Sequence, residues 1–200
     1  METKEKTSEK IIKILFKEPF SDHTASSLAK TIGISRQGIW KTLSKLSREN
    51  LICLKSIANT KKSASNITLN LKNSLTAKTL SLILEKEALN YKRWRNNFKK
   101  LEKPTFFTIL FGSILHSPKE ANDIDILVVA KTRKDFKAVE SIILEVQQTQ
   151  IKRIHAIDLT KKELKTELKN ENKAYIESLK KGIVLFGQEN FINFIEEIST

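Results

Sequence analysis

Two aspartates, Asp123 and Asp125, stand two residues apart at the start of an apolar, β-prone run that extends to Ala130. Because side chains alternate along a strand, both carboxylates are expected to project from one face. Carboxylates this close repel each other, and a bound divalent cation would remove that cost. Mg²⁺ prefers oxygen ligands and bridges to substrate phosphates, so the pair predicts a magnesium site that handles a phosphorylated substrate.

A glycine–serine pair, Gly112 and Ser113, ends the preceding apolar run, which begins at Thr105 and is typical of a buried strand. Gly112 lets the backbone approach a phosphate closely, and Ser113 adds a hydroxyl donor. If residues 114–120 begin as a helix, the N-terminus of that helix would favour the same anion. The pair therefore predicts a phosphate site next to the two carboxylates.

The order of these pieces resembles the minimal prokaryotic members of the DNA polymerase beta-type nucleotidyltransferase superfamily. A Gly-Ser pair at the end of one strand is followed, after nine residues, by Asp-x-Asp at the start of the next. The resemblance covers roughly residues 104–187. It implies that the glycine and serine hold ATP or another NTP and that the two aspartates bind Mg²⁺. A nucleotidyl group would then pass to a protein or small-molecule hydroxyl, and pyrophosphate would leave.

The family usually has a third carboxylate on a later strand, where it serves as base and metal ligand. The corresponding strand here spans residues 151–159, with His155 at the expected position and Asp158 three residues on. Alternation points Asp158 to the opposite face. Imidazole is a poor Mg²⁺ ligand but could be a general base. Three outcomes stay open: His155 takes the place of the third carboxylate, Asp158 reaches the two aspartates through a bulge in its strand, or catalysis is weak or lost. A structural role at a strand end is an equal alternative for His155.

The first half of the chain carries three amphipathic helix patterns and then two short strands, within residues 8–72. Gly33 supplies the turn before the third helix, and Ser35 can cap that helix. The arrangement resembles the helix-turn-helix of bacterial and archaeal winged-helix regulators. Residues 36–50 would form the recognition helix, and the polar loop 58–66 between the strands would form the wing.

A winged helix of this kind is expected to bind double-stranded DNA with its third helix in the major groove. Residues at the start of that helix are best placed to reach base edges, whereas lysines farther along it and in the wing would contact phosphates. The predicted DNA-binding residues are Arg36, Gln37, Lys41, Lys45, Lys61 and Lys62. Winged helices also serve as protein-interaction modules, and that alternative stays open.

The positive charge of the chain lies in one half. Residues 1–103 hold 22 Lys and Arg against 9 Asp and Glu, whereas residues 104–200 hold 14 of each. A basic half is typical of proteins that bind a phosphate polymer, and a general lysine bias would not spare the second half. One cysteine excludes an internal disulfide, and no apolar run reaches the roughly 18 residues of a membrane span. We therefore expect a cytoplasmic protein with no membrane association.

Together these patterns predict an α+β protein of three parts: a winged helix over 1–73, a helical connector over 74–103, and a small nucleotidyltransferase-like domain over 104–200. The last is expected to be a mixed sheet with flanking helices. The connector could mediate a homodimer, which would match a palindromic DNA site.

Three functions remain open from the sequence. The first is a DNA-binding, Mg²⁺-dependent nucleotidyltransferase. The alternative is a transcriptional regulator whose nucleotidyltransferase fold is a catalytically weak or inactive domain for nucleotide sensing or dimerisation. The third is an antitoxin that modifies a partner ribonuclease toxin.

Overall fold

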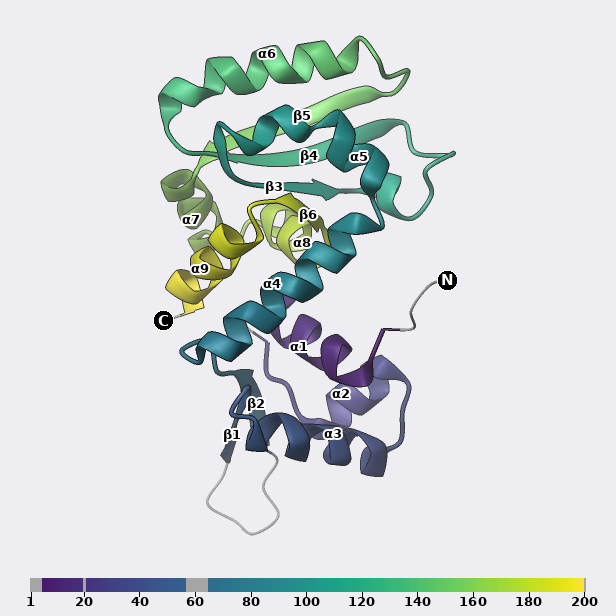
Figure 1. The fold of residues 1–200 in the computed structure, drawn as a ribbon, viewed down its shortest axis with the longest axis vertical. Coiled ribbons are helices and arrows are strands. Elements are labelled where there is room, and N and C mark those ends of the chain that lie inside the picture. The colour runs from purple at the N-terminus through teal and green to yellow at the C-terminus, as the bar shows by residue number, and fades with distance from the viewer. Residues whose placement is uncertain (1–4, 20, 57–64, 200) are drawn as a thin grey trace. The chain divides into compact units, whose positions relative to one another are not determined.

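The computed structural model describes residues 5–19, 21–56 and 65–199 (Figure 1). Helices and strands are mixed along the chain, which confirms the predicted α+β class. The chain divides into two compact units, residues 1–83 and 84–198. The division falls within helix α4, Ser74–Leu89, inside the predicted connector.

The first unit has the element order that the sequence predicted for a winged helix. Three helices precede a two-stranded antiparallel sheet: α1 Thr7–Lys17, α2 Ala25–Ile32, α3 Arg36–Arg48, β1 Ile52–Ser56 and β2 Ser65–Leu69. The side chain of Ser35 accepts a hydrogen bond from the Gly38 N–H and so caps α3. Helix α3 ends two residues earlier than predicted, next to Asn50, whose φ of 55° leaves the helical region.

A single apolar core holds this unit together. Each helix turns one stripe inward, and β2 adds one buried side chain between its polar neighbours. The fully buried members include Ile11, Leu28, Ile39, Leu43 and Ile67.

The base of the wing is tied to the segment before α2. The Ile67 N–H donates to the His23 carbonyl oxygen at 2.8 Å, and the His23 N–H donates to Asn66 Oδ1 at 3.1 Å. These bonds fix where β2 leaves the core. The predicted DNA contacts Lys61 and Lys62 lie outside the described residues.

The second unit is built on a four-stranded mixed sheet of order β5-β4-β3-β6. Strand β3 is antiparallel to β4 and β6, whereas β4 and β5 are parallel and joined through α6. The elements are α5 Lys92–Asn97, η1 Lys99–Glu102, β3 Thr105–Phe111, η2 Ser113–Leu115, β4 Asp123–Ala130, η3 Arg133–Asp135, α6 Phe136–Gln147, β5 Arg153–Thr160, α7 Lys161–Lys169, α8 Lys173–Lys181, β6 Ile183–Phe186 and α9 Gln188–Ser199.

Helices cover both faces of this sheet, with α5 and α6 on one side and α7, α8 and α9 on the other (Figure 1). Ile124 and Ile126 of β4 share a buried cluster with Trp94 of α5 and with Phe98, which follows α5. The C-terminal part of the predicted connector therefore belongs to the core of this unit. Because β4 alternates, Asp123 and Asp125 point away from that cluster.

No helix within the described ranges is both long and apolar enough to cross a lipid bilayer.

Candidate metal centre and nucleic-acid interface

Asp123, Asp125 and His155 lie together where the parallel strands β4 and β5 begin. The register places Asp125 beside His155. His155 Nδ1 lies 3.8 Å from Asp123 Oδ2 and 3.8 Å from Asp125 Oδ1. One ligand atom from each residue lies within 4.8 Å of the other two. We call these three residues the acid–imidazole cluster.

The Gly112 turn packs directly against this cluster. Phe111 pairs with Asp125 across β3 and β4, so the chain turns at Gly112 beside the Asp125 carboxylate. Gly112 has φ 83° and ψ −166°, and a Cβ there would lie 2.1 Å from Asp125 Oδ2. Glycine thus leaves room that any other residue would fill. Ser113 is exposed next to it.

These residues fit a divalent cation by two observations. The donor set is two carboxylates and one imidazole, all of which are common metal ligands. The missing Cβ at Gly112 leaves the space that the Asp125 carboxylate occupies beside the glycine–serine turn.

The α-helix considered after Ser113 does not form. The chain makes the three-residue 3₁₀ turn η2 there, with the His116 N–H donating to the Ser113 carbonyl oxygen at 3.0 Å. A single turn lacks the aligned peptides that create a helix dipole. Any phosphate at this turn would therefore depend on individual backbone and hydroxyl donors.

The possibility that Asp158 reaches the cluster through a bulge is also wrong. Strands β4 and β5 stay in register from the Asp123–Arg153 pair to the Ala130–Thr160 pair. Asp158 pairs with Val128 and is exposed. His155 occupies the third position of the cluster.

The charge balance of the cluster depends on burial and on the close spacing of the acids. Burial raises the pKa of the Asp125 carboxyl above its ordinary value, repulsion from Asp123 adds to the rise, and attraction to His155 opposes it. A raised folded-state pKa favours the neutral form. Its contribution to stability is therefore complete below the ordinary pKa of aspartate and is lost as pH rises through the folded-state pKa.

Asp125→Asn is consequently expected to raise the melting temperature at about pH 7 in the presence of a chelator. The amide removes the repulsion from Asp123 and the cost of burying a charge. The gain should vanish at about pH 3, where the aspartate is protonated in both states. Thermal unfolding at the two pH values measures the effect, and equal melting temperatures at neutral pH would contradict it.

Two residues that the sequence did not mark hold the cluster's strands in place. Gln147 Oε1 accepts from the Ile154 N–H at 2.7 Å, and Lys152 Nζ donates to the backbone carbonyls of Ala121 and, at 3.2 Å, of Lys119. These bonds fix the start of β5 and the loop before β4. No sequence signal marks them, because each depends on chain segments that meet only in the fold.

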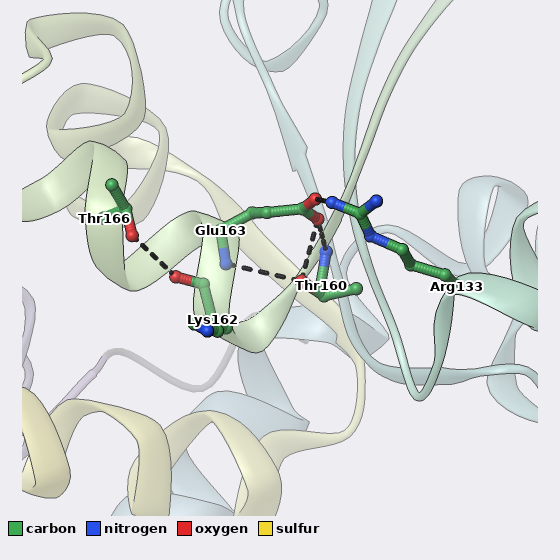
Figure 2. A network of polar contacts seen from close by, with 5 residues as sticks. All are labelled: Arg133, Thr160, Lys162, Glu163 and Thr166. Carbon is green, nitrogen blue, oxygen red and sulfur yellow. Dashed lines mark hydrogen bonds and ion pairs between the residues drawn. The ribbon is translucent and has the colours of Figure 1, made fainter.

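A cavity of about 400 Å³ lies at the other end of β5, beside the start of α7. Glu163 and Arg133 in its lining are already paired (Figure 2): the Glu163 carboxylate accepts from the Thr160 N–H at 2.8 Å and its hydroxyl at 2.7 Å, and it also contacts Arg133. These bonds lower the pKa of Glu163, with Thr160 as the largest cause. The polar network mainly caps α7 and is separate from the acid–imidazole cluster.

Helix α3 presents the predicted DNA-binding side chains to solvent. Arg36, Gln37, Lys41 and Lys45 are all exposed, whereas Ile39, Leu43 and Leu46 of the same helix are buried. Arg36 and Gln37 are the first two residues of the helix. Lys45 Nζ lies 3.8 Å from Glu49 Oε1, a weak exposed ion pair that leaves the lysine available to a phosphate.

Comparisons with known proteins bear on the first unit. Residues 7–59 match the family described as HTH domain. No curated protein matches the chain.

Among solved structures, the chain is similar to the adhesin competence repressor AdcR from Streptococcus pyogenes. The identity is 17%, the TM-score is 0.36, and the match covers 48% of this chain and 66% of that one, just under two thirds. Two structures of a ZitR mutant from Lactococcus lactis match at 17% identity. Their TM-scores are 0.35 and 0.36, with 72% and 74% of this chain covered and 80% and 77% of theirs.

The family match and the order of three helices and two strands agree. The N-terminal unit is a winged helix-turn-helix domain.

Proposed function

We propose that the protein is a DNA-binding transcriptional regulator whose winged helix places α3 in the major groove. The observation that carries this proposal is the exposed face of α3 in a domain of the HTH family. Arg36 and Gln37 stand at the end of the helix that enters the groove in this class of domain, where bidentate side chains reach base edges. Lys41 lies farther along the same helix, within reach of phosphates.

The charge distribution supports the same proposal. The positive excess of the chain belongs entirely to residues 1–103. Each lysine or arginine that neutralises a phosphate releases a counterion, which gives affinity without sequence preference. Binding through this half should therefore weaken steeply as salt is added.

Fluorescence anisotropy with duplexes selected from a random DNA pool tests the proposal. Arg36→Ala and Gln37→Ala should each cost about 1–3 kcal/mol on the selected duplex and relax base preference at one position. Lys41→Ala should weaken all duplexes alike and reduce the salt slope by about 1. Lys137→Ala, an exposed lysine of α6, is the matched control and should change neither quantity.

Salt-insensitive binding, or wild-type selectivity in the Arg36 and Gln37 variants, would count against α3 as the reading element. In that case the remaining role for this domain is to bind another protein.

A second candidate is nucleotidyl transfer, and the observation that favours it is the packing of the Gly112 turn against Asp125. In the transfer, the oxygen of an acceptor hydroxyl forms a bond to the α-phosphorus of an NTP. The bond between the α-phosphorus and the oxygen that bridges the α- and β-phosphates breaks. Pyrophosphate leaves, and the hydroxyl proton passes to a base, for which His155 is the candidate. Mg²⁺ held by Asp123 and Asp125 would neutralise charge on the phosphates.

Labelled NTPs, Mg²⁺ and cell extract test this candidate. Any labelling of an acceptor is expected to disappear in the Asp123→Ala/Asp125→Ala double variant. Asp158→Ala is the matched control, because Asp158 is an exposed acid on the adjacent strand outside the cluster, and it should retain labelling. Labelling that survives in the double variant would remove the aspartates from the reaction.

The homodimer stays a prediction. Leu75, Leu82 and Leu89 of α4 are exposed at seven-residue spacing, which supplies one apolar position per heptad, whereas a coiled-coil seam uses two. A twofold pair of α3 helices would suit a palindromic operator.

A further inference from the structure

We propose that the acid–imidazole cluster selects a first-row transition-metal cation over Mg²⁺, because its third ligand is an imidazole nitrogen. The proposal goes beyond DNA binding. It rests on the cation role of the second candidate function, requires neither nucleotide nor transfer, and assigns His155 to the metal in place of the role of base.

The distances between the ligand atoms of the three residues fit a single bound ion. Two atoms bound to one ion by bonds of about 2.0–2.2 Å lie about 3 Å apart at a right angle and at most about 4.4 Å apart in line. His155 Nδ1 is 3.8 Å from an oxygen of each aspartate, which is inside these limits. The bound of 4.8 Å on the whole cluster exceeds the upper limit by about 0.4 Å, a shift that side-chain rotation supplies.

The imidazole ligand disfavours Mg²⁺. Mg²⁺ holds its waters strongly and takes oxygen ligands, so an imidazole in its shell replaces a good ligand with a poor one. Imidazole suits iron, nickel, copper and zinc, and affinity along the first-row divalent ions is lowest for Mn²⁺, which shares the carboxylate and water ligands of Mg²⁺. Mn²⁺ is therefore the most demanding probe of a preference over Mg²⁺. The substitution of His155 for a third carboxylate also removes one negative charge, which weakens the attraction on which a hard cation depends.

The side chains of the cluster are accessible to solvent. The exposed side-chain fractions are 56% for His155, 36% for Asp123 and 23% for Asp125. An ion held by all three would keep coordination positions open on the solvent side for water or a phosphate oxygen.

The other histidines do not compete for this role. His23 is buried, with Nε2 3.0 Å from the Glu18 carbonyl oxygen. His116 is exposed but outside the cluster, which makes it the matched control for adventitious metal binding.

The test is calorimetric titration of the full chain with Mn²⁺ or Mg²⁺ alone, together with pulsed EPR of the Mn²⁺ complex. The wild type should bind Mn²⁺ more tightly and show coupling to a directly bound ¹⁴N nucleus. His155→Asp supplies an oxygen in place of the nitrogen, so the Mn²⁺:Mg²⁺ affinity ratio should fall by about tenfold and the ¹⁴N coupling should disappear.

His116→Ala should keep both the ratio and the coupling. His155→Gln, which adds no charge, covers the case in which the aspartate variant does not fold, and it should also lose the coupling.

Equal affinity of the wild type for the two ions, absence of Mn²⁺ binding, or a nitrogen signal that survives in both His155 variants would overturn the proposal. If the wild-type protein bound Mn²⁺ as expected but transferred no nucleotide, only the second candidate function would be contradicted.

Discussion

Replacement of Gly112 with alanine is expected to reduce divalent-cation binding at the acid–imidazole cluster by at least about tenfold. The backbone at Gly112, φ 83° and ψ −166°, belongs to a region that is open essentially to glycine alone, and another residue there costs about 1–3 kcal/mol. The added methyl group would also lie 2.1 Å from Asp125 Oδ2. The carboxylate must turn away, or the turn must shift, and either movement breaks up the ligand set.

Titration of Gly112→Ala with Mn²⁺ measures this effect, and anisotropy with the selected duplex should give wild-type DNA affinity because α3 is untouched. Gly33→Ala is the control: Gly33 also has positive φ, at 76°, but a Cβ there meets nothing within 4 Å. It should leave cation binding unchanged. A Gly112→Ala protein that binds Mn²⁺ as the wild type does would show that the turn and the carboxylate are independent.

The parts of this fold that the sequence predicted are those controlled by local pattern. Strand β3 begins and ends as expected, because Thr105–Phe111 is a largely apolar run bounded by Pro104 and Gly112. Alternation along β4 placed Asp123 and Asp125 on one face, and the parallel pairing with β5 then brought His155 to them. A two-residue period is sufficient for this conclusion.

The parts that the sequence missed depend on contacts between distant segments. The helical pattern in residues 74–101 could not show which core receives Trp94, Phe98 and Leu101, because periodicity identifies a buried face but not its partner. Residues 161–181 contain no glycine or proline, yet two helices, α7 and α8, form there and are separated near Glu171, whose φ is 53°.

Replacement of Gly187 with alanine is expected to destabilise the second unit by several kcal/mol. Gly187 joins β6 to α9 with φ 76°, and a Cβ would lie 2.0 Å from the Phe106 carbonyl oxygen and 2.8 Å from Phe107 Cα. Both atoms belong to the backbone of the central strand β3, which cannot move aside as a flexible side chain would. Left-handed strain of about 1–2 kcal/mol and overpacking of about 1–3 kcal/mol then act together.

The loss should spread through the face that α9 covers. Phe107 packs against Phe191 and Phe194, with ring centroids 5.2 and 5.5 Å away, so displacement of the turn separates α9 from β3. Native-state hydrogen exchange should show lower protection in β3, β6 and α9 and unchanged protection in α1–α3. Gly33→Ala has the same φ without the collision, so it should cost only the strain, and only in the first unit.

Because the total stability of a domain is about 5–15 kcal/mol, the Gly187 variant is expected to expose its sheet at temperatures where the winged helix still binds DNA. If Gly187→Ala and Gly33→Ala lowered the free energy of unfolding equally, the backbone of β3 would have moved to accommodate the extra methyl group. That result would contradict the rigid packing of β3 on which the position of Asp125, at the far end of the same sheet, depends.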